Sequence, residues 1–158
     1  MNTDNTNYAY EEAEAQMQAI HEMVAALNCD YDRLDELTDQ DTELTQEEQA
    51  ELTELKDAAG GCADRDDAST RAHENALSVE VRSGWSEVGA VGAPEEFRIV
   101  LCTGGPHVEI RGELDQNGEP RGARLDYFGA SVPRSTYHGP LSDAGVLLTY
   151  CQEFYFGE

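Results

Sequence analysis

Basic residues are scarce in this chain of 158 residues, which has a single lysine, Lys56, and nine arginines against 33 acidic residues. The formal net charge of −23 is far larger than the roughly 2–8 charges that keep a small domain soluble. Nucleic acids and anionic lipid surfaces repel such a chain, so we expect it to bind neither directly. The expected partner is a protein surface rich in basic residues.

Long apolar runs are also missing, because no stretch approaches the ~20 residues of a membrane span. The first residues, MNTDNTNYAY, lack the basic and apolar character of a targeting segment. Cys29, Cys62, Cys102 and Cys151 contain no C-x-x-C spacing, so free thiols in a reducing cytoplasm are expected. Two disulfides remain an alternative, since the number of cysteines is even.

No sequence motif of an enzyme or of a metal site is found. There is no G-x-S-x-G elbow, and the glycines after Cys102 are not followed by the G-K-[ST] of a phosphate loop. The segment DQNGE at 115–119 lacks the distant acidic ligand of a calcium loop. We therefore expect a protein that is not an enzyme and that needs no cofactor or metal. An unrecognised catalytic site, or a metal site built from His107, His138 and a cysteine, is the alternative.

The negative charge is concentrated in the first half of the chain. Residues 1–78 hold 21 acids and 4 bases, a net charge of −17, whereas residues 79–158 carry only −6. Within 29–57 alone, twelve carboxylates stand against Arg33 and Lys56. Such an asymmetry points to an interaction surface. A merely solvated surface and halophilic adaptation are alternatives, although the latter should spread acids over both halves.

Hydrophobic spacing predicts helices in this acidic half. A helix over residues 8–27 has an apolar stripe at steps of four and three: Ala13, Met17, Ile20, Val24 and Leu27. A short helix is plausible within 30–41. The strongest helix signals follow it, because Thr45 and Glu48 form a capping box at the start of a helix that Gly60 ends. A further helix, with a face of alanines, is expected over about 66–77.

The second half alternates between apolar and polar residues as strands do. Strands are expected near residues 79–82 and 97–101, and a hairpin over 107–128 turns at Asn117-Gly118. Residues 129–140 read as irregular. A helix capped by Ser142 is expected to close the sheet, with a terminal strand over 153–156 as the alternative. The fold class is thus α+β: two or three acidic helices in 1–78, then a small antiparallel sheet and a helix in 79–158, together one compact unit.

The segments LSVEVRSGW, EFRIVLCTGGPHVEIRGELDQNGEPRGARLDY and LLTYCQEFYFGE resemble a group of small proteins encoded by phages and mobile elements. This resemblance covers about residues 77–158 and carries no catalytic motif. Small acidic phage proteins of this kind are similar to anti-CRISPR and antirestriction proteins, many of which imitate DNA. The resemblance implies a protein that evades host defence in the host cytoplasm.

Helical spacing suggests how such mimicry would work. Carboxylates three or four residues apart on a helix lie about 5–6 Å from each other, a spacing similar to that of phosphates along a DNA strand. The expected function is a non-enzymatic inhibitor, most specifically an anti-CRISPR protein, that occupies the basic DNA-binding groove of a host complex. The predicted partner-binding residues are Asp35, Glu36, Asp39, Asp41, Glu43, Glu47, Glu51 and Glu54.

Two other functions remain open. One is an antirestriction protein that inhibits a restriction enzyme. The other is an acidic protein–protein interaction module, which could form a homo-oligomer through the sheet or through Trp85, a residue type enriched at interface hot spots. For Trp85 itself, packing in the core is the first expectation.

Overall fold

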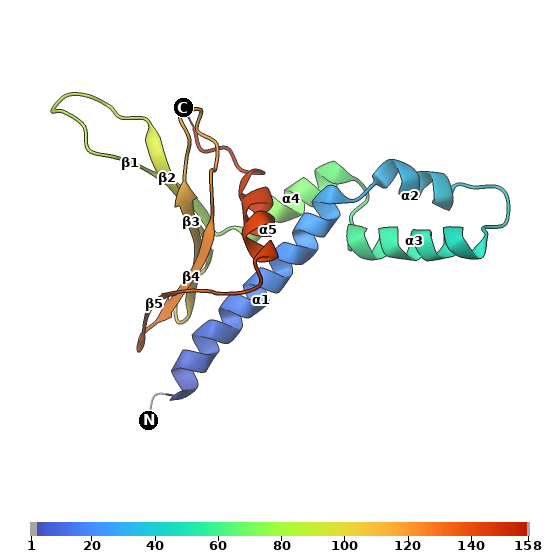
Figure 1. Cartoon of the computed structure of the whole chain (residues 1–158), viewed down its shortest axis with the longest axis horizontal. Coiled ribbons are helices and arrows are strands. Elements are labelled where there is room, and N and C mark those ends of the chain that lie inside the picture. Colours follow the sequence, from blue (N-terminus) through green and yellow to red (C-terminus); the bar gives the residue numbers. More distant parts are fainter. Residues whose placement is uncertain (1–2, 158) are drawn as a thin grey trace.

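The structure, a computed structural model, describes residues 3–157, with side chains from residue 8 onward. Its described part is α+β, as predicted, with five helices and one five-stranded antiparallel sheet (Figure 1). The helices are α1 (Thr3–Asn28), α2 (Tyr31–Thr38), α3 (Gln46–Ala59), α4 (Arg65–Asn75) and α5 (Ser142–Cys151). The strands are β1 (Ser78–Ser83), β2 (Pro94–Cys102), β3 (His107–Glu113), β4 (Arg124–Gly129) and β5 (Val132–Thr136).

Four helices precede the sheet, where two or three were expected. The longest, α1, begins at Thr3 instead of residue 8, and its predicted apolar stripe is buried along its whole length. This stripe lets α1 pack against the sheet, α4 and α5 at once. The helix therefore forms the central support of the molecule.

The predicted capping box of α3 is present. The Thr45 hydroxyl accepts a hydrogen bond from the Glu48 backbone N–H at 3.2 Å, and the Glu48 carboxylate accepts one from the Thr45 N–H at 2.8 Å. The hydrogen bonds outweigh the cost of desolvation and lower the pKa of Glu48. At the other end Gly60 has φ +58°, a left-handed conformation in which a side chain is unfavourable.

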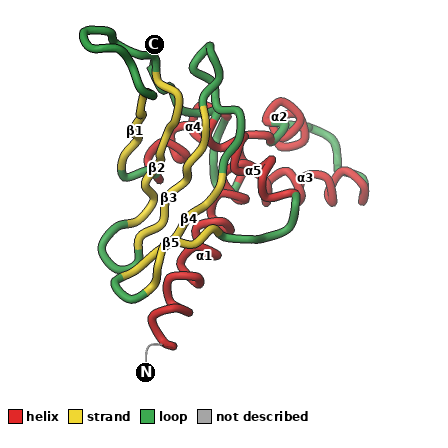
Figure 2. The backbone as a smooth tube through the Cα atoms, turned by 60° about the vertical axis from the view of Figure 1, so that its left-hand side comes forward, coloured by secondary structure: helices red, strands yellow, loops and turns green. Residues whose placement is uncertain are grey.

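The sheet is a meander in the order β1-β2-β3-β4-β5 (Figure 2). The predicted hairpin is confirmed, since β3 pairs with β4 and places Val108 opposite Tyr127 and Ile110 opposite Leu125. At the turn between them, Gly118 has φ +80° and donates its N–H to the Asp115 carbonyl at 3.0 Å. One face of the sheet is covered by α1 and α5, and no helix in the described part of the chain lies on the opposite face (Figure 1).

Three expectations are wrong. Residues 129–140 are not irregular throughout, because β5 lies there and pairs with β4. Ser142 does not cap α5; it is the first helical residue, and Leu141 precedes it without a side-chain cap. The sheet is not closed by this helix but stays open, with β1 and β5 as its edges. The alternative to this helix, a terminal strand over residues 153–156, is not present either, since these residues form no strand.

The hydrophobic core joins α1 and α4 to β2, β3, β4 and α5. Tyr150 lies fully buried in it, and its hydroxyl donates to the Ala72 carbonyl at 3.0 Å. Burial raises the pKa of Tyr150 to about 12. All four cysteines are free thiols. Within residues 3–157, no helix combines the length and the apolar character that crossing a membrane requires.

Candidate functional site

Helices α2 and α3 run antiparallel to each other and project from the rest of the molecule (Figure 1). We call residues 30–59 the acidic hairpin. It contains twelve acidic residues and only two basic ones, Arg33 and Lys56, and so carries a net charge of −10. Nearly half of the net charge of the protein thus lies on a thin protruding element.

A small apolar seam holds the two helices of the acidic hairpin together. Leu37 is buried, whereas Leu34, Leu52 and Leu55 are half-buried. The base of the hairpin is fixed to α1 by Tyr31, whose hydroxyl donates to the Ala26 carbonyl at 2.7 Å. Such a short seam uses few side chains, so most of the surface of both helices stays in water.

The predicted partner-binding residues all lie on this hairpin. Asp35 and Glu36 are on α2, Glu47, Glu51 and Glu54 are on α3, and Asp39, Asp41 and Glu43 lie in the connection between the two helices. Seven of these eight residues are exposed, and Glu51 is half-buried. Tertiary structure therefore gathers one set of carboxylates at the outer end and on the sides of a single protrusion.

Arg33 binds two of the eight residues. Its Nε and Nη2 donate to both oxygens of Glu51 at 2.9 and 3.0 Å, and its Nη1 donates to Glu36 at 3.2 Å. The hydrogen bonds from Arg33 lower the pKa of Glu51. Of the three predicted residues on α3, the middle one, Glu51, is consequently neutralised. The six other carboxylates form no ion pair within the described residues.

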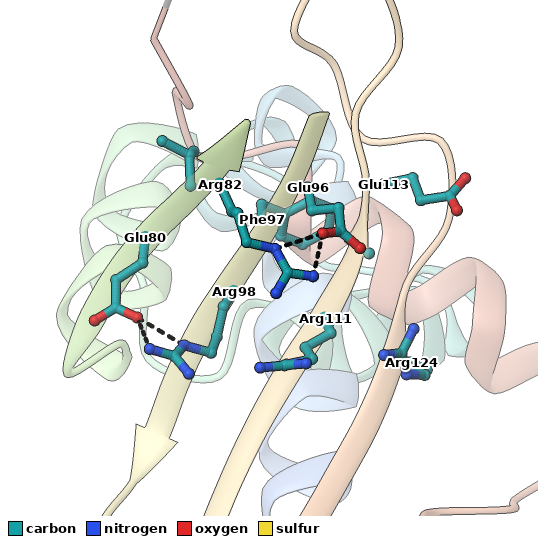
Figure 3. Close-up of a pocket in the computed structure, with 10 residues that line it drawn as sticks. Glu80, Arg82, Glu96, Phe97, Arg98, Arg111, Glu113 and Arg124 are labelled. Carbon is teal, nitrogen blue, oxygen red and sulfur yellow. Dashed lines mark hydrogen bonds and ion pairs between the residues drawn. The ribbon is translucent and has the colours of Figure 1, made fainter. Parts of the chain in front are cut away.

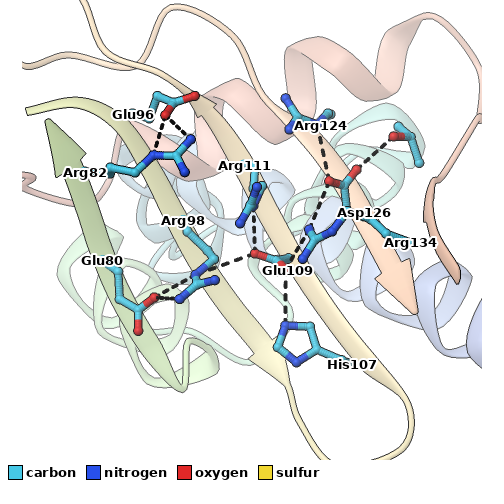
Figure 4. A network of polar contacts seen from close by, with 11 residues as sticks. Glu80, Arg82, Glu96, Arg98, His107, Glu109, Arg111, Arg124, Asp126 and Arg134 are labelled. Carbon is cyan, nitrogen blue, oxygen red and sulfur yellow. Dashed lines mark hydrogen bonds and ion pairs between the residues drawn. The ribbon is translucent and has the colours of Figure 1, made fainter. Parts of the chain in front are cut away.

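The sequence interpretation missed a second polar surface, on the sheet. We call the side of the sheet that faces away from the helices the outer face. Figure 4 shows its charged residues, which come from all five strands. Five of the nine arginines lie there, together with four carboxylates: Arg82, Arg98, Arg111, Arg124, Arg134, Glu80, Glu96, Glu109 and Asp126.

Charges of the outer face alternate along the strands. Arg98, Arg111 and Arg124 lie directly opposite one another on β2, β3 and β4. The next row holds two carboxylates, Glu109 opposite Asp126. Like charges opposite each other are unfavourable in a sheet, but each row here lies next to one of opposite sign. The signal in the sequence was the alternation of opposite charges at i and i+2, as in Glu109 and Arg111.

Glu109 is the centre of this network and is only 1 % exposed. Its carboxylate accepts hydrogen bonds from Arg134 at 2.9 Å and from Arg111 at 3.1 Å, and Arg98 lies 3.6 Å away. Burial by itself raises the pKa of Glu109, but the hydrogen bonds from Arg111 and Arg134 outweigh it and lower the pKa. His107 Nε2 lies 3.4 Å from the same carboxylate and forms no hydrogen bond with any of the described residues.

A shallow cavity of about 350 Å³ lies on the outer face (Figure 3). All four arginines that line it face carboxylates. Arg98 pairs with Glu80, Arg82 with Glu96, Arg111 with Glu109 at 3.1 Å, and Arg124 with Asp126 at 3.3 Å. Because these cations are already neutralised, the cavity is a poor site for an anion. The outer face is best understood as a surface whose charges satisfy one another.

Trp85 is fully exposed, which contradicts the expected core packing. It lies in the loop between β1 and β2, where Val88 and Val91 are fully exposed as well. No group of three or more His, Cys, Asp or Glu side chains in the described residues is arranged to hold a metal ion. Comparison with known protein families, curated proteins and solved structures found no match to this chain.

Proposed function

We propose that this protein is a non-enzymatic inhibitor that occupies a basic, nucleic-acid-binding groove with its acidic hairpin. In the most specific form of the proposal, the groove belongs to a CRISPR effector in the cytoplasm of a bacterial host. The hairpin takes the place of the DNA, so the protein binds neither DNA nor a membrane itself.

The observation that carries the proposal is the combination of charge and shape in the acidic hairpin. A net charge of −10 is placed on two short helices that project into solvent (Figure 1). A protruding element of this kind can enter a groove that a flat surface cannot. Helical carboxylates about 5–6 Å apart present negative charge at a spacing comparable to that of a phosphate backbone.

The contrast with the outer face of the sheet also supports the acidic hairpin as the binding surface. Arginines and carboxylates are paired there, whereas Asp35, Asp39 and Glu43 of the hairpin have no cationic partner among the described residues. Charges that are not neutralised within the protein remain free to attract a basic partner. They also steer association, which is fastest at low salt.

An antirestriction protein would use the same hairpin, and only the identity of the captured partner separates the two inhibitors. We therefore propose capture of partners from a host lysate at low salt, elution with increasing salt, and competition of the eluted complex with its DNA target. Binding that excludes DNA is the expected result. A partner that binds the protein and its DNA target simultaneously would contradict the proposal.

A variant with reversed charges tests whether the partner binds the acidic hairpin. The test variant carries Lys at Asp35, Asp39, Glu43 and Glu54, all of which are exposed. We expect binding to weaken by about 30-fold to 1000-fold at low salt, since each close charge pair contributes on the order of 1 kcal/mol.

The matched control reverses four exposed acids outside the hairpin: Glu11, Glu22, Glu74 and Glu119. Both variants change the net charge from −23 to −15, so a purely global electrostatic effect would weaken both equally. Loss of binding only in the hairpin variant supports the proposed surface. Equal loss in both would show that the overall charge, and not the hairpin, attracts the partner.

A further inference from the structure

Strand β1 is an edge of the sheet, because β2 is its only neighbour within the described residues. In Figure 2, no described segment lies beyond β1 on its open side. An edge strand presents unpaired backbone N–H and C=O groups, with which another strand can pair. Natural proteins usually protect such an edge with a short strand, a covering segment or inward-pointing charges.

On its helix-covered face, the open edge of β1 carries apolar side chains and no inward-pointing charge. Val79 and Val81 lie opposite the buried Ile99 and Phe97, on the helix-covered face of the sheet, and yet are 40 % and 46 % exposed. Leu77, just before the strand, is also exposed. Residues 77–93 contain two acids and one base, a net charge of −1, so like-charge repulsion between two copies is weaker at this edge than at the acidic hairpin.

We propose that β1 pairs with β1 of a second copy of this chain, in antiparallel orientation, to form a dimer with one continuous ten-stranded sheet. The two-fold axis of such a dimer is perpendicular to the sheet and keeps each face on its own side. Directly opposite residues share a face, so one residue of β1 must lie opposite its own copy.

Charge decides which residue lies on the axis. With Val81 on the axis, Glu80 of each copy lies opposite Arg82 of the other. A shift of the axis by one residue places Glu80 opposite Glu80 or Arg82 opposite Arg82, which is unfavourable. Only the register centred on Val81 continues the alternating charges of the outer face across the dimer.

The same register also matches the apolar residues at the ends of β1. If pairing continues beyond the strand, Trp85 of one copy lies opposite Leu77 of the other, on the helix-covered face. Both side chains are exposed in the single chain. The acidic hairpin lies at the opposite end of the molecule (Figure 1), so the dimer leaves both hairpins accessible. This inference does not depend on the proposed inhibitory function.

Two cysteine variants of the full chain test the register. In Val81→Cys the two introduced thiols face each other, and Cα atoms about 4.5–5.5 Å apart are within reach of a disulfide. In Val79→Cys the thiols are displaced by four residues along the strands, about 14 Å, and cannot join. After mild oxidation, we expect a covalent dimer from Val81→Cys only. The unmodified protein is the control for the four native thiols.

A charge exchange tests the interface without breaking contacts inside the chain. Arg82 pairs with Glu96, so the variant R82E/E96R keeps that pair in reversed order but places a second carboxylate opposite Glu80 of the other copy. We expect the dimer dissociation constant to rise by about tenfold to a hundredfold, because the contact occurs twice in the dimer. The control is E113R/R121E, an exchange of an exposed pair away from β1. Both variants keep the net charge of −23.

The mass of each protein in solution, measured by light scattering or sedimentation over a concentration series, reports the result. The expected dimer becomes stronger with salt, because salt screens the repulsion between two acidic copies. A chain that stays monomeric at all concentrations would overturn the inference. The edge of β1 could then pair only with a strand of another protein. Equal cross-linking of the two cysteine variants, or a dimer unaffected by R82E/E96R, would also overturn it.

Discussion

Replacement of Glu109 by Gln tests whether the network on the outer face stabilises the fold. The substitution keeps the size of the side chain but removes the charge that Arg98, Arg111 and Arg134 surround. Breaking a buried ion pair by removing one partner typically costs about 3–5 kcal/mol. The three arginine side chains are 39 %, 27 % and 42 % exposed, so they regain part of their hydration. We therefore expect a loss of about 2–3 kcal/mol in the free energy of unfolding.

A loss of this size leaves a folded protein, since small domains have about 5–15 kcal/mol of stability. It should lower Tm by about 5–10 °C for a chain of this length. Urea unfolding followed by far-UV circular dichroism is the suitable measurement, because the fully exposed Trp85 is a poor fluorescence reporter of unfolding. The control is Glu113→Gln, whose carboxylate is exposed and lies 4.0 Å from Arg121. It should change stability by less than about 0.5 kcal/mol.

The pH dependence of the free energy of unfolding provides a second check on the role of Glu109. The pKa of Glu109 is lowered in the folded protein from its usual value of 4.5, so the folded state binds its proton less readily than the unfolded state. Its stabilising contribution is present above about pH 4.5 and is lost as the pH falls through the lower folded pKa. The stability difference between the unmodified protein and Glu109→Gln should therefore shrink below about pH 4.5. If the difference stayed constant on acidification, or matched that of Glu113→Gln at neutral pH, the network would not have the role described.

Three further substitutions test the local structure by the same unfolding measurements. Thr45→Ala removes the side-chain cap of α3 and should cost about 1 kcal/mol; a cost of zero would show that the cap does not stabilise the hairpin. Gly112→Ala would bring a Cβ within 2.0 Å of the Gly122 carbonyl oxygen, so a cost above about 2 kcal/mol is expected, and an unchanged Tm would contradict this close approach. Tyr150→Phe leaves the Ala72 carbonyl, near the end of α4, without its donor and should cost about 1–3 kcal/mol, whereas a neutral effect would mean that water replaces the hydroxyl.

Helices were predictable from the sequence where the signal is local. The apolar stripe of α1 and the capping box of α3 each depend on residues three or four positions apart, whose geometry a helix fixes. The hairpin of β3 and β4 depends on strand alternation and a short turn, which are local as well. In contrast, β5 has a proline and an arginine near its centre and no clear alternation, and it is a strand because β4 offers it a partner.

The candidate surfaces also separate what local sequence signals predict from what long-range packing decides. The sequence by itself determined how much negative charge the protein carries, that it is concentrated in residues 29–57, and which segments become helices. Only the tertiary structure decided that α2 and α3 project together, that Arg33 neutralises Glu51 across 18 positions, and that Arg134 reaches Glu109 across 25. Burial and ion pairing depend on which elements lie side by side, and long-range packing fixes that arrangement, whereas the pattern within any one element does not.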